Sequence, residues 1–144
     1  MDTTRPARVL VVTDHTAATP ELLAAMRDRA AKGEVLFRLL VPNPAHSEMH
    51  LRHPERHDKA EQAERVLRQA LPAFEGAAGG HVVGSVSIRH DPYDAIEELM
   101  FSEPIDEIIL SVAPHEVSRW LHLDLPHRLS HLHLPVTTVG HPTP

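Results

Sequence analysis

The chain contains no cysteine, and this absence removes several kinds of chemistry at once. It excludes disulfide bonds, thiolate catalysis, iron–sulfur ligation and every zinc site that depends on sulfur. Any metal ion would have to be held by histidine and carboxylate side chains. Aromatic residues make up only 3% of the sequence, so a surface that stacks bases or sugars is also disfavoured.

Basic residues are in the minority, since 14 Lys and Arg stand against 20 Asp and Glu for a net charge of -6. This sign opposes a surface that neutralises phosphates, so we expect no nucleic-acid partner. No apolar run approaches the roughly 20 residues of a membrane span, and the run that begins at Val9 is too short for a signal-peptide core. We therefore expect a cytoplasmic protein without membrane contact, and the 144 residues suit a single domain, 1–144.

Short apolar runs rich in β-branched residues alternate with helical patterns along the whole chain. The runs predict strands at residues 8–14, 35–41, 81–90, 107–112 and 136–139. Helices are predicted after Thr19 and Asp91, each an N-cap followed by proline, from Asp58 to Gly76 after a loop at 45–57, and after the N-cap Asp124. The alternation predicts an α/β fold: a Rossmann-like open five-stranded parallel sheet ordered 3-2-1-4-5, with helices on both faces. The third strand is expected at or near an edge.

A sheet of this order would bind a ligand beyond the carboxyl ends of its first and fourth strands, where the strand order reverses. The candidate ligand-binding residues are those that follow these strands or their neighbours: Asp14, His15, Thr16, Val41, Asp91, Ser111, Ala113, His115 and Arg119. A Ser-His-Asp arrangement is conceivable among them, but consecutive strand residues face opposite sides and the sequence has no Gly-x-Ser-x-Gly turn. We therefore predict no catalytic residues and no enzymatic activity.

Several short motifs, in order, resemble those of the universal stress protein family over nearly the whole chain. They are the first strand ending in Asp14, Leu39-Leu-Val41, His90-Asp-Pro-Tyr-Asp-Ala-Ile96, Asp106-Glu-Ile-Ile-Leu110 and Leu134-Pro-Val-Thr-Thr-Val139. The resemblance implies a Rossmann-like domain that acts in stress response and is commonly a homodimer. It places the dimer contact on the closing strand, which begins at Pro135 and ends at Val139, and makes Asp14, Val41 and Asp91 pocket positions.

The family members that bind ATP carry Gly-x2-Gly-x9-Gly-Ser/Thr after the fourth strand, and this chain departs from that pattern. Ser111 and Pro114 stand where the first two glycines would be, and Glu116 adds negative charge. Proline removes a backbone donor and side chains replace bare backbone, so a triphosphate would lack its usual partners. Arg119 is the one nearby cation that we expect to compensate in part. We predict no cofactor, while ATP or AMP on a non-standard phosphate loop stays an alternative.

Thirteen histidines suggest a second alternative, a His-dependent metal or pH sensor. His46, His50, His53 and His57 would share one helical face, which is a pattern that suits Zn, Ni or Cu. Pro54 disfavours helix at His53, so we predict solvent-exposed histidines there and no metal site. His127 and His131 are also one helical turn apart, without an acidic neighbour at ligand spacing. The favoured prediction is a binding or regulatory module without bound ATP, with a small ligand or a protein partner that the sequence does not identify.

Overall fold

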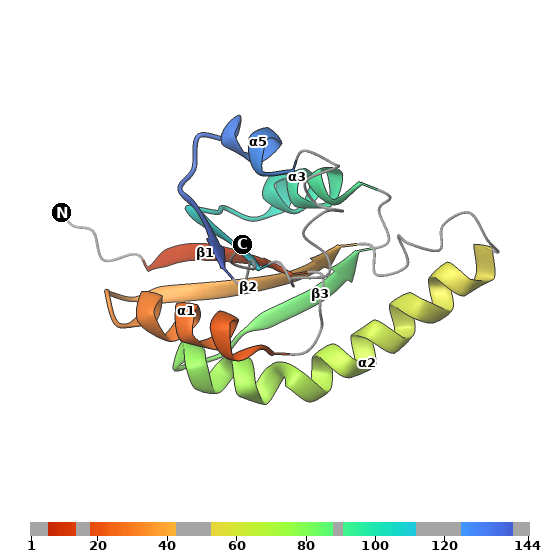
Figure 1. The fold of residues 1–144 in the computed structure, drawn as a ribbon, viewed down its shortest axis with the longest axis horizontal. Coiled ribbons are helices and arrows are strands. Elements are labelled where there is room, and N and C mark those ends of the chain that lie inside the picture. The colour runs from red at the N-terminus through yellow and green to blue at the C-terminus, as the bar shows by residue number, and fades with distance from the viewer. Residues whose placement is uncertain (1–5, 14–17, 43–52, 88–90, 112–124, 140–144) are drawn as a thin grey trace, which may run out of the picture.

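The protein is built on one five-stranded parallel sheet in the order β3-β2-β1-β4-β5 (Figure 1). The computed structural model describes residues 6–13, 18–42, 53–87, 91–111 and 125–139, with the side chains of 53–60 and 126 excepted. The strands are β1 (Ala7–Thr13), β2 (Val35–Pro42), β3 (Val83–Ser87), β4 (Glu107–Ser111) and β5 (Val136–Val139). This arrangement confirms the predicted fold class and strand order.

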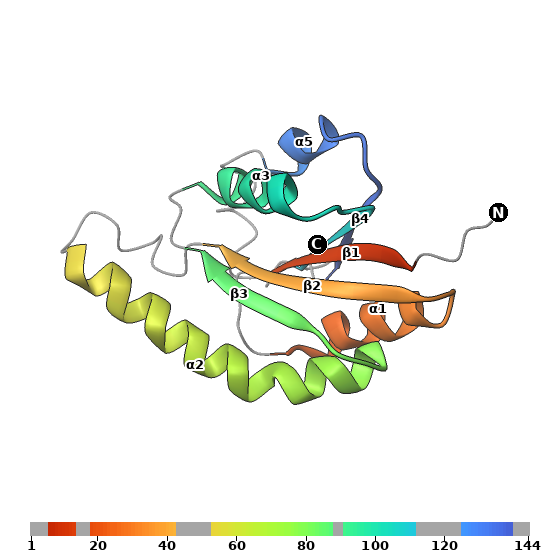
Figure 2. The same cartoon turned by 180° about the vertical axis from the view of Figure 1, so that it is seen from behind.

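Helices cover both faces of the sheet, as the views from the two sides show (Figures 1 and 2). They are α1 (Pro20–Ala30), α2 (His53–Ala78), α3 (Pro92–Ser102) and α5 (Leu125–Ser130). Alternate strand residues supply the two cores. Val9 and Val11 pack with the side of α1 and α2, whereas Leu10 and Val12 pack with the side of α3 and α5. The unbroken apolar run of β1 is therefore explained, because both of its faces are buried.

The two proline-marked helix starts lie where the sequence predicts them. Thr19 is the N-cap of α1 and its Oγ1 accepts the N–H of Leu22, with Pro20 in the first turn. Asp91 caps α3 in the same way, ahead of Pro92. In both cases an extended residue with a side-chain acceptor satisfies an N–H that the helix itself leaves unpaired.

The second helix is longer than predicted at both ends. It begins at His53, inside the segment predicted as a loop, and Pro54 lies in its first turn. Proline is tolerated there because the first N–H groups of a helix have no intrahelical acceptor. The helix also runs through Gly76 to Ala78, since Phe74 and Ala77 are buried in the core, and it ends before Gly79, whose φ of 78° favours glycine.

The third strand is an edge strand, as predicted, but begins later than residue 81. The N–H of Val82 donates to Glu75 Oε2 at 3.1 Å, so this residue is tied to the end of α2 before the ladder begins. Gly84 faces α2, where an added Cβ would lie 3.2 Å from Leu67 Cδ2. The missing side chain therefore lets α2 pack closely on the strand. Among the described residues, no helix combines the length and the apolar character needed to cross a membrane.

Candidate functional site

The carboxyl ends of β1 and β4 meet at the point where the strand order reverses. Chain order runs from β1 outward to β2 and β3 on one side, and from β4 to β5 on the other. Thr13 and Ser111, the last residues of β1 and β4, are direct partners in the register. Ligands of open α/β sheets bind beyond such a reversal, so this pair marks the inner boundary of the candidate site.

Thr13 and Ser111 are the two buried polar residues of the described chain. Thr13 is 1% exposed and Ser111 is 3% exposed. They continue the side of the sheet occupied by Val11 and Ile109, which faces α1 and α2. No hydrogen bond joins the Ser111 hydroxyl to another residue within the described ranges. A buried hydroxyl without a partner costs about 1–3 kcal/mol, so this position is one that a ligand group would stabilise.

Asp91 has a structural role in addition to its predicted place near the site. Its Oδ1 accepts the N–H of Tyr93 at 2.9 Å, which caps α3. The same carboxylate accepts two hydrogen bonds from Arg128 Nη1, at 3.1 Å to Oδ1 and 2.9 Å to Oδ2. Its charge is therefore balanced within the chain, and this carboxylate ties the start of α3 to α5.

Arg128 is the cation near this edge that the sequence analysis missed. Its guanidinium carbon lies 4.5 Å from the centre of the Tyr93 ring, in addition to the ion pair with Asp91. Leu125 and Leu129 on the same helix are buried, and this anchors α5 beside α3. Burial and the nearby Glu97 carboxylate raise the pKa of Tyr93 above its ordinary value, and Arg128 acts in the opposite direction. The helical spacing of the leucines could have indicated that Arg128 flanks a buried face, but not which helix it meets.

Val41 lies near the end of β2 and is 1% exposed, so it belongs to the core of this edge. The remaining candidates lie outside the described residues, and the predictions for them stay predictions: Asp14, His15, Thr16, Ala113, His115, Arg119, His46 and His50. The structure thus places Val41, Asp91 and Ser111 at the same edge of the sheet, and it adds Thr13 and Arg128 to them.

The structure describes only some of the histidines that the sequence analysis singles out. His53 and His57 both lie in the first turns of α2, but their side chains are outside the described set. On the opposite side of the sheet, the rings of His127 and His131 stand edge to face with centroids 5.2 Å apart. Within the parts of the chain that the structure describes, no three His, Asp or Glu side chains gather as metal ligands would.

The chain was also compared with known families and proteins. No protein-family model matches it, and no curated protein sequence matches it.

Proposed function

We propose that the chain is a binding module that resembles the universal stress proteins, takes a small polar ligand at the carboxyl edge between β1 and β4, and acts by regulation and not by catalysis. The observation that carries this proposal is the buried Ser111 hydroxyl, which lies beside Thr13 at the reversal of the strand order. Hydroxyl groups are retained in such a dry position when a hydrogen-bonding partner compensates their burial. A ligand with neutral hydrogen-bond donors and acceptors would suit a site bounded by this hydroxyl.

The charges around the site support a ligand other than a nucleoside triphosphate. Arg128, the described cation that lies closest to the start of α3, is neutralised by Asp91. In the sequence, Ser111 and Pro114 stand where glycines would expose backbone N–H groups to phosphates, and Glu116 adds a negative charge. A triphosphate would therefore meet few free donors and additional negative charge.

A non-catalytic role agrees with the local sequence around Ser111. Ser111 ends a strand without the sharp Gly-x-Ser-x-Gly turn that exposes a nucleophile. A serine nucleophile also needs a base within hydrogen-bonding reach, and its usual companions at this edge are aspartate and histidine. Asp91 is committed to Tyr93 and Arg128, which supports a positioning role for that carboxylate.

Native mass spectrometry of the freshly purified protein tests this proposal. We expect a small-molecule mass retained by the wild type and by Ser102→Ala, which removes a hydroxyl bonded to Leu99 O at the far end of α3. Ser111→Val should release it, because the larger apolar side chain fills the position of the hydroxyl. Retention by Ser111→Val would contradict the assignment of the site to this edge.

Added nucleotides test the second part of the proposal. For a dissociation constant above about 1 mM, ATP at about 1 mM stabilises a protein by less than about 0.4 kcal/mol. The corresponding rise in Tm is below about 2 °C for a chain of this size. A larger rise with ATP, ADP or AMP, which Ser111→Val abolishes, would replace the polar ligand by a nucleotide at the same site.

The closing strand supports a homodimer. β5 pairs with β4 on one side and ends the sheet on the other, and Thr137 and Thr138 are exposed. We propose that two copies join along this edge, from Pro135 to Val139, to form one continuous sheet. An edge strand offers unpaired backbone groups for such pairing.

A further inference from the structure

On the face of the sheet toward α3, two apolar side chains remain exposed. Leu40 on this face is buried against α3, but Leu36, four residues earlier on β2, is 45% exposed, and Val83 on β3 is 50% exposed. Helix α3 ends before Glu103, whose carboxylate meets Arg38, so Leu36 lies past the end of this helix. Exposed apolar side chains that lie together are one mark of a binding surface.

A hollow of about 330 Å³ lies over Leu36 and Val83. Its other lining residues are Arg8, Phe37, Arg38, His81 and Glu103. In the sheet register Leu36 is the direct partner of Arg8, and Val83 is the direct partner of Arg38. Each apolar side chain therefore lies beside a basic one. The volume suits a small molecule, which would touch apolar and cationic surface at the same time.

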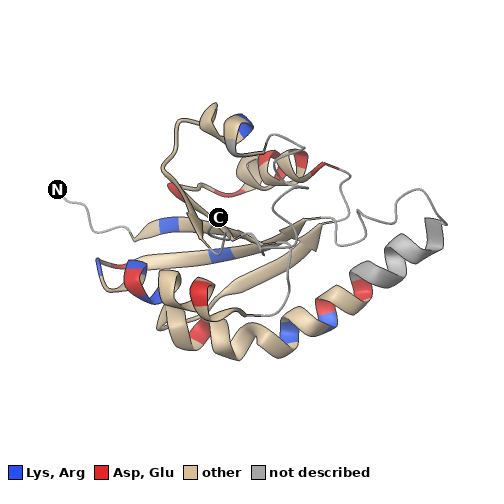
Figure 3. Cartoon of the chain, viewed as in Figure 1, with Lys and Arg blue, Asp and Glu red and all other residues tan. Residues whose placement is uncertain are grey.

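The strands beneath the hollow carry basic charge, since β1 and β2 hold one arginine each and no acidic residue (Figure 3). The Arg38 charge is balanced within the chain. Its Nε donates to both oxygens of Glu103, at 3.2 Å to Oε1 and 3.0 Å to Oε2, and its Nη1 donates to Leu39 O at 2.8 Å. His81 Nδ1 lies 3.0 Å from Glu75 Oε2, so this side chain also has a carboxylate partner.

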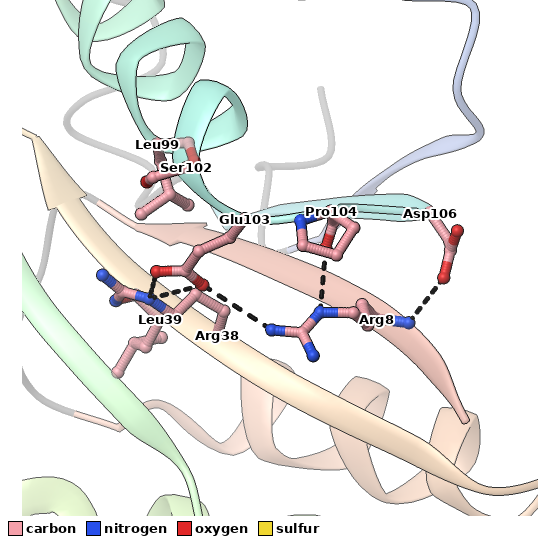
Figure 4. Close-up of polar contacts among 8 residues, drawn as sticks. All are labelled: Arg8, Arg38, Leu39, Leu99, Ser102, Glu103, Pro104 and Asp106. Atoms are coloured by element: carbon pink, nitrogen blue, oxygen red, sulfur yellow. Dashed lines mark hydrogen bonds and ion pairs between the residues drawn. The ribbon is translucent and has the colours of Figure 1, made fainter. Parts of the chain in front are cut away.

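Arg8 is the surplus cation of the hollow. Its Nη2 lies 3.8 Å from Glu103 Oε1, beyond hydrogen-bond length, and that carboxylate already accepts from Arg38. The Asp106 carboxylate is directed at the backbone N–H of Arg8, at 2.8 Å (Figure 4). Arg8 Nε donates to Pro104 O at 2.9 Å, which fixes the guanidinium, and within the described ranges no hydrogen bond engages Nη1 or Nη2. Arg8 therefore offers two positioned donor groups.

We propose that this hollow binds a small carboxylate with an unbranched aliphatic body. The carboxylate accepts hydrogen bonds from Arg8 Nη1 and Nη2, a planar fork that matches two carboxylate oxygens. The aliphatic body covers Leu36 and Val83 and removes their surface from water. One negative charge balances the hollow, because Glu103 already neutralises one of its two arginines. Arg8 lies near the start of β1 and Thr13 at its end, so the inference does not depend on the ligand proposed at the carboxyl edge.

The proposal is tested by an NMR titration of the full chain with sodium octanoate. We expect saturable binding to the wild type with a dissociation constant below about 1 mM. Arg8→Gln should weaken it about fivefold, and Arg8→Lys less, because lysine keeps the charge and loses the fork. Val83→Thr should weaken it about threefold, since a hydroxyl replaces a methyl group on the same β-branched shape. Arg27→Gln is the matched control, because Arg27 is exposed on α1, against the other face of the sheet, and this variant should bind as the wild type does.

Analogues of octanoate separate its two parts. Octylamine keeps the chain and reverses the charge, acetate keeps the carboxylate without the body, and inorganic phosphate is an anion without either. Each should bind at least about tenfold more weakly than octanoate. Octylamine that bound as well as octanoate would show apolar contact alone, and acetate or phosphate that did so would show anion attraction alone. Either result would overturn the proposal.

Amide chemical shifts from the same titration identify the place of binding. Shifts centred on the first residues of β1, β2 and β3 support this hollow. Shifts confined to the carboxyl ends of the strands, or octanoate binding that Ser111→Val abolishes, would assign octanoate to the other site and refute this one. Equal weakening by Arg27→Gln and Arg8→Gln, or no saturation by about 10 mM octanoate, would refute it as well.

Discussion

The Asp91 carboxylate gives the sharpest test of how α3 and α5 are held together beside the carboxyl ends of the strands. It caps α3 through the Tyr93 N–H and pairs with Arg128 on α5, with both partners partly exposed at 31% and 29%. Loss of an N-cap costs about 1 kcal/mol, and a partly exposed ion pair of this kind contributes about 0.5–1 kcal/mol. We therefore expect Asp91→Ala to lower the free energy of unfolding by about 1.5–2 kcal/mol.

Asp91→Asn separates these two contributions. Asparagine caps a helix nearly as well as aspartate, so this variant keeps the bond to the Tyr93 N–H and loses only the charge opposite Arg128. We expect it to lower the free energy of unfolding by about 0.5–1 kcal/mol, and Arg128→Met to have a similar effect. Arg128 stacked on Tyr93 adds apolar contact that methionine partly retains.

Urea denaturation at neutral pH, followed by circular dichroism, measures all three variants. The double variant Asp91→Asn with Arg128→Met should lose less unfolding free energy than the two single variants lose together, because both changes remove the same ion pair. If Asp91→Ala left the stability unchanged, the carboxylate would not hold α3 to α5 and its three hydrogen bonds would contribute nothing to stability. If Asp91→Asn were as damaging as Asp91→Ala, the capping argument would be refuted.

Three further predictions follow from contacts elsewhere in the fold. Arg29 donates to both Glu107 oxygens, at 2.9 and 2.7 Å, and these bonds lower the pKa of Glu107. The stabilisation by this ion pair is present above the ordinary carboxyl pKa and is lost as the pH falls through the lowered pKa. The wild type and Glu107→Gln should therefore differ by about 1 kcal/mol in unfolding free energy at neutral pH, and this difference should vanish in denaturation series at acid pH. A difference that persisted in strong acid would contradict the ion pair as its source. Gly79→Ala should cost about 1–2 kcal/mol by thermal unfolding because φ is 78°, whereas Gly80→Ala, with open space and no such φ, should be close to neutral; equal losses would refute the backbone argument. Thr137→Lys on β5 should convert the proposed dimer to a monomer in light scattering, while Ser130→Lys on α5 should not; a dimer that survives Thr137→Lys would place the contact elsewhere.

Much of the fold could be predicted because its signals are local. In Thr19-Pro20 and Asp91-Pro92, the first residue caps a helix and the proline suits its first position. The starts of α1 and α3 therefore follow from two adjacent residues each. The parallel sheet with helices on both faces follows from the alternation of strands and helices together with right-handed crossovers. In the same way, the carboxyl ends of β1 and β4 are placed together by topology alone, which is why Ser111 could be named as a candidate.

The features that sequence could not give depend on contacts between distant segments. Arg128 meets Asp91 across 37 residues, and Arg38 meets Glu103 across 65, so neither pairing has a local signal. The start of α2 at His53 was missed for a different reason. Pro54 disfavours helix at the residue before it, but in the first turn of a helix a proline is tolerated.

Helix α3 leads away from the proposed ligand site, and the way it is held bears on whether ligand binding moves it. Its 11 residues span about 16 Å between the cap at Asp91 and Glu103. Arg128 from α5 pairs with Asp91 at the start of the helix, and Arg38 from β2 pairs with Glu103 at its end. Because both ends are tied to other elements, we expect ligand binding at the edge between β1 and β4 to leave α3 in place. Amide chemical shifts of protein with and without its retained small molecule test this expectation, and ligand-induced shifts that extend along α3 as far as Glu103 would refute it.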